Sequence, residues 1–413
     1  MQDTLIRVNL TESNTDALGY IWAYRLILDR EPTSEEIDIG IKQSSPEALA
    51  RTLLVSREFD SLLTTVSETS PALALEERPI AVQWAFRLFL GREVGDERTL
   101  SSVVESIRST SDIRRMIAFS EEFRVRDDKA LSQLLTSEVA KDYRPFCGTP
   151  APPGYFSDFL GNKTRCSFLP EHFTSISQSI LGPPGSTTNP PLHDAAEWVG
   201  TLRAANEASG TFTVVELGAG WAPWLVVGHN LARRKGITNV HLIGVEGDKG
   251  HMKFMEQNFI DNGIDPTKHS LIFGVVGTSD GLARFPKIDS SQADYGSAAV
   301  YDDTDSSRPM IEVPCFSLAG LLRGLPHIVD LIHCDIQGSE AEVMAATEET
   351  LNEKVRRVVI GTHSRTVEGL LLDQFSGMGW KLEHESVCTY RQNSSGVMGL
   401  HIDGVQVWRN PNI

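Results

Sequence analysis

Residues 214–224, with the sequence VVELGAGWAPW, decide the fold of this 413-residue chain. An apolar run leads into Glu216, Gly218 and Gly220 follow at alternate positions, and the next residues can begin a helix. That order predicts a strand, a tight turn and a helix N-terminus, which is the local architecture of a nucleotide-type cofactor site. A dinucleotide fingerprint would need a third glycine at position 223, where this chain has proline. A purely structural glycine turn is the alternative that the stretch leaves open.

Strands and helices alternate around this stretch through the C-terminal half. The expected strands are residues 212–217, 240–246, 269–276, 328–334 and 355–361, and the expected helices are 222–235, 249–262, 317–324, 339–349 and 366–378. Two final strands, near 380–387 and 397–409, have only loop residues between them and should pair antiparallel. We therefore expect an α/β fold: a doubly wound, Rossmann-like parallel sheet with an antiparallel C-terminal hairpin. A ligand would then bind at the carboxyl ends of the strands.

The first 140 residues predict an all-α domain with two internal repeats. YRLILDRE at 24–31 matches FRLFLGRE at 86–93, and SREF at 56–59 matches SEEF at 120–123. Two copies of a small helical unit can stack and bury their apolar stripes against each other. We expect the arginines of these motifs to form structural ion pairs rather than a ligand site; they are Arg25, Arg30, Arg87 and Arg92.

A connector of different composition, residues 141–195, joins this region to a third domain at 196–413. Proline and glycine cluster at 150–154 and 181–185, and such density breaks helices and strands. The connector nevertheless carries many aromatic side chains, which a flexible linker would not. We therefore interpret it as an ordered segment that packs on the following domain and forms part of a lid.

The net charge of −17 argues against a nucleic-acid partner, because so acidic a surface repels phosphate backbones. Five widely spaced cysteines without metal-ligand spacing favour a reduced, cytoplasmic setting. We expect no membrane span, because no apolar run reaches about 18 residues. The N-terminus lacks the pattern of a signal peptide, so we expect none.

Two acidic residues follow expected strands at the edge where a ligand would bind. Glu246 ends the second strand, where an acid in doubly wound folds accepts hydrogen bonds from ribose hydroxyls. Asp248 could also be the ribose-binding acid, but its position favours a role as the N-cap of the next helix. Asp335 ends the fourth strand and should point into the cleft, and a simple turn residue is the alternative.

These elements together resemble the FkbM family of S-adenosylmethionine-dependent methyltransferases. The resemblance rests on residues 214–224, 244–248, 335–340 and 360–363, and is most specific in the D-x-x-G-x-E element that begins at Asp335. The connector sequence at 158–161 and the pair Glu197-Trp198 add to it. It implies a class I methyltransferase fold and O-methylation of a hydroxyl on a sugar, glycan or polyketide. The N-terminal repeats resemble phycobilisome-linker helical modules, which implies an interaction or oligomerisation role rather than catalysis.

The family pattern also assigns cofactor-binding residues. The glycine loop falls on Glu216, Gly218, Ala219 and Gly220, the ribose acid on Glu246, and Asp335 completes the set. Many methyltransferases hold adenine with an acid after the third strand. This chain has Val275 and Val276 there, so backbone groups and apolar contact would take that part. Gln337 stands where the family often has glutamate.

A neutral hydroxyl is a poor nucleophile, so the acceptor needs a base or a metal. We take His363 as the first candidate base, Asp335 as the second and His193 as the third. Asp335, Glu340 and His363 could instead bind a divalent metal, an alternative that we rank below metal-free catalysis. The rival hypothesis for the whole chain is a non-catalytic scaffold whose helical repeats bind protein partners or a second copy.

Overall fold

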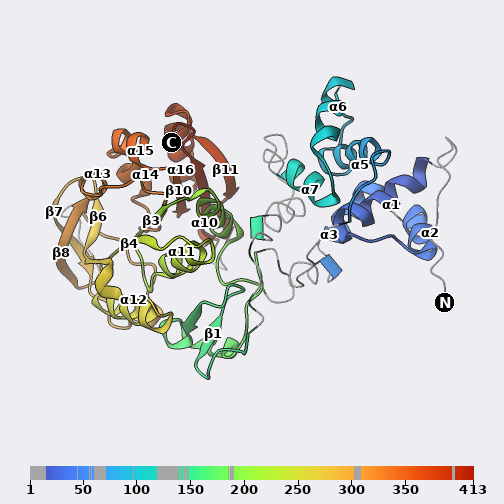
Figure 1. Ribbon diagram of the computed structural model, residues 1–413. Helices are drawn as coiled ribbons and strands as arrows, with labels where there is room; N and C mark the ends of the chain where they lie inside the picture. Colours follow the sequence, from blue (N-terminus) through green and yellow to red (C-terminus); the bar gives the residue numbers. More distant parts are fainter. Residues whose placement is uncertain are drawn as a thin grey trace. The chain divides into compact units, whose positions relative to one another are not determined.

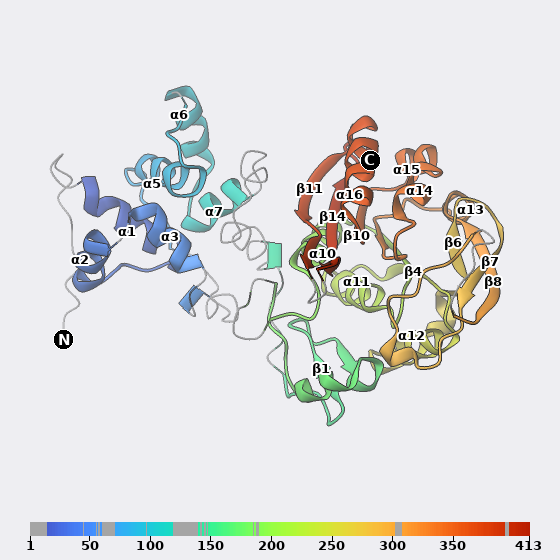
Figure 2. The ribbon, with the colours of Figure 1, turned by 180° about the vertical axis from the view of Figure 1, so that it is seen from behind.

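The computed structural model describes residues 15–43, 45–54, 56, 58–59, 71–95, 97–118, 139–140, 143, 146, 148–184, 186, 190–301, 308–392 and 396–413. Two compact units divide the chain: Met1–Asp142 with Gly185–Thr188, and Tyr143–Pro184 with Asn189–Ile413 (Figures 1 and 2). Among the helices of the described ranges, none combines the length and apolarity that crossing a bilayer would take.

The first unit is helical. Its elements are α1 (Thr15–Leu28), α2 (Ser34–Gln43), α3 (Pro46–Leu54), α5 (Arg78–Ala85), the π-helix η2 (Phe86–Leu90), α6 (Glu97–Ser106) and α7 (Thr110–Ala118). The core of the unit comes from both copies of the repeat, because Leu26 and Ile27 of one and Leu88 and Phe89 of the other are fully buried. The SEEF motif at 120–123, which is the second copy of SREF, lies outside the described residues.

Arg25, Arg30 and Arg87 form structural ion pairs, as we predicted. Arg25 lies over the ring of Trp22 and bonds Glu31, and Arg87 lies over the ring of Trp84 and bonds Glu93 at 2.6 Å. Arg30 and Arg92 likewise lie over aromatic rings, and Arg30 also binds Glu36 and Glu58. The same contacts recur in both copies because each motif places its arginine three residues after an aromatic and six before a glutamate.

A seven-stranded sheet organises the second unit, in the order β11-β14-β10-β9-β3-β4-β5. The strands are β3 (Thr211–Leu217), β4 (Asn239–Glu246), β5 (Ser270–Phe273), β9 (Leu331–Cys334), β10 (Arg357–Thr362), β11 (Lys381–Ser386) and β14 (Gly404–Arg409). The strands from β10 to β5 pair parallel, whereas β14 pairs antiparallel with both β10 and β11. This order confirms the predicted doubly wound sheet with an antiparallel C-terminal pair. The chain adds β4 and β5 on one side of β3 and then β9 and β10 on the other side, so the strand order reverses at β3.

Helices cover both faces of the sheet, as alternation along the strands requires. Against one face lie α10 (Ala195–Glu207), α11 (Pro223–Arg234) and α12 (Lys249–Asp261), and against the other lie α14 (Glu340–Ala345) and α16 (Arg365–Gly377). Val359 and Val407 meet α10 at Gly200, while their neighbours Val358 and Trp408 join the core beneath α16. Two shorter helices, α13 (Leu318–Arg323) and α15 (Glu348–Lys354), contact each other.

Three expected elements are divided in the structure. The strand expected at 269–276 splits at Gly274 into β5 and β6 (Val275–Gly277), and β6 joins β7 (Gly281–Pro286) and β8 (Met310–Ser317) in a second sheet. Gly274 has φ 151°, and a Cβ there would meet the carbonyl of Pro314 at 2.6 Å. The helix expected at 339–349 becomes α14 and α15.

The last strand expected, 397–409, becomes β13 (Met398–Ile402) and β14. β13 pairs with β12 (Thr389–Gln392) in a separate exposed hairpin, so β14 pairs with β11 without it. The connector forms a hairpin of β1 (Tyr155–Ser157) and β2 (Lys163–Arg165), followed by the 3-10 helices η3 (Cys166–Phe168) and η4 (Glu171–Ile176). Its apolar side chains pack around Trp221, directly after the glycine turn.

Candidate active site

The glycine turn after β3 lies against the ends of two neighbouring strands. Gly218 and Gly220 have φ values of 71° and 55°, which favour glycine. The amides of Gly218 and Ala219 donate to the carbonyl of Val245 on β4 at 3.0 Å. A Cβ on Gly218 would lie 1.9 Å from the carbonyl oxygen of Asp335, so this turn and the end of β9 touch through backbone.

Glu216 lies beneath the turn rather than in the cleft. Its carboxylate accepts hydrogen bonds from the amides of Trp224 at 3.4 Å and Leu225 at 3.0 Å, and so satisfies the first turn of α11. Burial raises the pKa of this carboxyl to about 8. The structure therefore gives Glu216 the contacts of a residue that fixes the turn and helix.

Glu246 reaches from the end of β4 to the glycine turn. One oxygen accepts the amide of Gly220 at 2.8 Å, and the other accepts the amide of Asp248 at 2.7 Å. Nδ1 of His251 lies 3.4 Å from the second oxygen. Asp248 caps α12 as predicted, because its side chain accepts the amide of His251 at 2.9 Å. Glu246 is thus held in one orientation at the cleft wall.

A cavity opens at the carboxyl ends of β3, β4 and β9. Six of the residues expected to bind a cofactor line it: Gly218, Gly220, Glu246, Val275, Val276 and Asp335. Glu216, Ala219 and His363 are not among the lining residues. The predicted position of a ligand at the carboxyl edge therefore coincides with a cavity that most of the predicted residues share.

Part of the wall comes from residues that the sequence interpretation missed. Tyr295 lines the cavity, stacks on His251 with ring centroids 4.4 Å apart, and donates from its hydroxyl to the carbonyl of Phe168 at 2.5 Å. Tyr301 also lines it and donates to the carbonyl of Val276 at 2.6 Å. The aromatic residues of the irregular segment after β7 were the available signal. Only the folded chain brings Tyr295 against His251 of α12 and Trp221 of the glycine turn.

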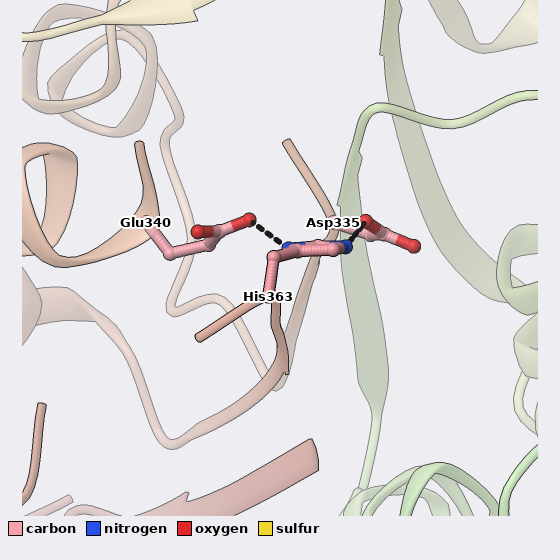
Figure 3. A group of neighbouring side chains, drawn as sticks. All are labelled: Asp335, Glu340 and His363. Atoms are coloured by element: carbon pink, nitrogen blue, oxygen red, sulfur yellow. Dashed lines mark hydrogen bonds and ion pairs between the residues drawn. The ribbon is translucent and has the colours of Figure 1, made fainter. Parts of the chain in front are cut away.

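Asp335, His363 and Glu340 meet beside this cavity (Figure 3). Nε2 of His363 lies 3.2 Å from Oδ1 of Asp335, and Nδ1 lies 3.0 Å from Oε1 of Glu340. Glu340 is fully buried and also accepts the amides of Ile336 and Gly338, whereas the side chain of Asp335 is 41% exposed. The ends of β9 and β10 and the start of α14 supply the three side chains.

The two carboxylates hold His363 in its charged form. Burial opposes protonation, but the hydrogen bonds to Asp335 and Glu340 raise the pKa of His363 to about 10. Burial also opposes ionisation of Asp335, yet the bond from His363 lowers its pKa. At neutral pH both imidazole nitrogens therefore carry protons that face carboxylates. An imidazolium has no lone pair to accept a proton, so the charged state disfavours His363 as a base and leaves Asp335, the second candidate, better placed for that role.

The same three side chains are the group in the described part of the chain whose ligand atoms could surround a metal, all within 4.8 Å of one another. The imidazolium already lies between the two carboxylates and offsets one of their two negative charges. His193, the third candidate base, precedes α10, with Nδ1 4.0 Å from Oε2 of Glu197. Burial lowers the pKa of His193, which favours its neutral form.

Comparison with known proteins adds one sequence relative. No protein-family model matches the chain. A protein of Jannaschia sp. (strain CCS1) named "Putative methyltransferase" is 31% identical over 277 residues, which cover 64% of this chain and 96% of the relative.

Solved structures resemble the chain weakly. A precorrin-6Y C5,15-methyltransferase of Geobacter metallireducens GS-15 is 11% identical with a TM-score of 0.30, and covers 51% of this chain and 86% of its own. An rRNA methylase of Streptococcus thermophilus is 9% identical with a TM-score of 0.30. The match covers 52% of this chain and 95% of the methylase. Scores this low add nothing to the fold, which rests on the strand order described above.

Proposed function

The chain belongs to the methyltransferase family that includes its Jannaschia relative, and from this premise we propose that it transfers a methyl group from S-adenosylmethionine to a hydroxyl group. The acceptor that we propose is a sugar, glycan or polyketide-type molecule, as in the FkbM family whose motifs the sequence resembles. The single observation that carries the proposal is the cavity at the switch point of the sheet, which the glycine turn, Glu246 and Asp335 share.

The residues around the cavity fit this cofactor. A turn with two glycines at positive φ lets backbone approach a ligand closely, and the wall offers both a carboxylate and apolar side chains. Glu246 would accept ribose hydroxyls, because a carboxylate keeps acceptor capacity beyond the two amides that it already binds. Val275 and Val276 would contact adenine through apolar surface and backbone.

Asp335 and His363 would prepare the acceptor. When bound, S-adenosylmethionine supplies an electrophilic methyl group, so the protein's own task is to align the acceptor and to receive its proton. Asp335 is the partly exposed member of the group and can accept a hydrogen bond from a hydroxyl. His363 would stay protonated, hold Asp335 in place and balance its charge, while buried Glu340 fixes the imidazole from the other side.

The group Asp335, His363 and Glu340 carries one net negative charge when both carboxylates are ionised. An exposed carboxylate in such a group can take the hydroxyl proton as the acceptor oxygen loses it. No metal is needed for that role, and we propose that the reaction is metal-free. The helical repeats would serve assembly, through a partner protein or a second copy of the chain.

The first test is cofactor binding to the purified protein. We expect S-adenosylhomocysteine to bind saturably in calorimetry, and radiolabelled methyl groups to pass from S-adenosylmethionine to members of a panel of sugars, glycans and polyketides. EDTA should change neither result. No binding at about 1 mM ligand, where an affinity near 4 kcal/mol would still register, would leave the non-catalytic scaffold as the better account.

A further inference from the structure

A buried ion pair that neither the glycine turn nor the Asp335 group contains lies directly behind both. His333 is on β9, two residues before Asp335, and its side chain is 5% exposed. Its Nε2 lies 2.9 Å from Oε1 of Glu197, in the first turn of α10. The other oxygen of Glu197 accepts the amide of Asp194 at 2.9 Å, which completes the capping box of that helix. The pair therefore joins α10 to the strand that ends at Asp335.

The imidazole also contacts the segment that follows the glycine turn. The ring of His333 stacks on Trp224, with centroids 5.2 Å apart and an interplanar angle of 27°. Trp224 lies in the first turn of α11 and meets Trp198, the neighbour of Glu197, edge to face at 5.0 Å. A cation over an indole face is attracted by the ring quadrupole. One side chain thus touches the start of α11, the start of α10 and the strand that carries Asp335.

Groups from several elements decide the charge of His333. Burial opposes protonation, but the bond to Glu197 raises the pKa of His333, and the carboxyls of Glu216 and Asp335 act in the same direction. His193 lies on the far side of Glu197. The hydrogen bond, the charge of Glu197 and the stacking on Trp224 all favour the imidazolium.

We propose that Glu197 and His333 are positioning residues of the cofactor site. Their ion pair fixes the start of α11 and the end of β9 in the one arrangement in which the glycine turn and Asp335 share a cavity. The end of β3, where the glycine turn begins, already touches the end of β9, because the amide of Asp335 donates to the carbonyl of Leu217 at 2.9 Å. A small rotation of α11 would therefore displace the cavity wall. The inference rests on the proposed function, since it takes S-adenosylmethionine as the ligand.

The test measures S-adenosylhomocysteine affinity by calorimetry in Glu197→Gln, His333→Gln and the double variant. We expect each single variant to bind about tenfold more weakly, a change of about 1.4 kcal/mol, and the double variant to bind no worse than either. Glu197→Asp should recover part of the affinity. Leu202→Ala is the structural control: it removes a fully buried side chain of the same helix and should lower Tm without weakening binding in the folded protein.

The pH dependence of S-adenosylhomocysteine affinity distinguishes a positioning role of the charged pair from a role in packing alone. The pKa of His333 is raised on folding, so the charged pair is fully present below about pH 6.5 and is lost as pH rises through the folded value. Wild-type affinity should therefore fall with rising pH, relative to Glu197→Gln. Folded variants with wild-type affinity and wild-type pH dependence would overturn the inference. A wild-type protein that binds no S-adenosylhomocysteine would instead overturn the proposed function.

Discussion

A methyl group added at position 218 would collide with the backbone of Asp335, which makes this residue the most tightly constrained of the glycines that line the cavity. Gly218 is held on one side by the carbonyl of Val245 and on the other by Asp335. Neither neighbour is a flexible side chain that could move aside. The glycine is needed here for close approach of two backbone segments as well as for its positive φ.

Gly218→Ala should therefore destabilise the protein far more than Gly210→Ala. Gly210 has φ 74°, close to the 71° of Gly218, but a Cβ there would meet nothing within 4 Å. We expect about 1–2 kcal/mol for the strained φ at position 210, and about 2–3 kcal/mol more at position 218 for the overlap. Urea unfolding of both variants measures the difference. Equal losses would mean that the contact with Asp335 is not rigid.

Glu246 is the residue whose loss should weaken cofactor binding most directly. Glu246→Ala removes the acceptor of two amides as well as the proposed ribose contact, and we expect S-adenosylhomocysteine affinity to fall more than tenfold, or about 1.4 kcal/mol. Glu246→Gln keeps the shape and isolates the effect of charge. Calorimetry decides, and unchanged affinity in the alanine variant would reject the ribose assignment.

At the scale of elements, the cleft is assembled where strands end. β3, β4, β9 and β10 run parallel, so their carboxyl ends bring Gly218, Glu246, Asp335 and His363 to one edge of the sheet. Alternation of strand and helix is enough to predict this edge, because parallel strands need crossover helices. The split at Gly274 was missed, because a glycine within an apolar run does not show whether the strand continues or turns.

The stability of the protein should depend on pH through His363, which joins the ends of β9 and β10 to the start of α14. Its folded pKa, about 10, lies above its ordinary value of about 6.5. Its contribution to stability is therefore fully present below about pH 6.5 and is lost as pH rises through about 10. The difference in unfolding free energy between wild type and His363→Gln should shrink over that window, measured by urea titration. His401→Gln, at an exposed histidine of β13, is the matched control substitution.

At the scale of the whole molecule, the chain divides into a helical unit and an α/β unit. The residues that line the cavity all belong to the second unit, which carries its own sheet and core. A unit with its own core can fold alone. Residues 143–184 and 189–195 of the connector belong to the second unit, and aromatic residues among them pack around Trp221 next to the glycine turn.

A chain of residues 143–413 should therefore bind S-adenosylhomocysteine within about twofold of the full chain, since no lining residue is removed. If the repeats serve self-association, sedimentation should show a smaller assembly for the shortened chain. Affinity reduced tenfold in a folded 143–413 chain would show that the helical unit contributes to the cofactor site.

The sequence by itself determined the class of fold, the edge of the sheet at which the cavity lies, and six of the residues that line this cavity. These follow from local rules: periodicity sets helix or strand, glycine marks the turn, and an acid after a strand must lie at its end. The contacts of Arg25 and Arg87 within their own repeat were also predictable, because the aromatic ring and the glutamate that each contacts lie three and six residues away.

Only the tertiary structure decided the chemical state of the side chains. From the sequence we expected His363 to act as a general base. Between Asp335 and Glu340, from separate elements, it is an imidazolium. Tyr295 and the pair of Glu197 with His333 were invisible for the same reason. Charge and hydrogen bonding depend on neighbours distant in sequence, and those neighbours are set only when the sheet and its helices pack together.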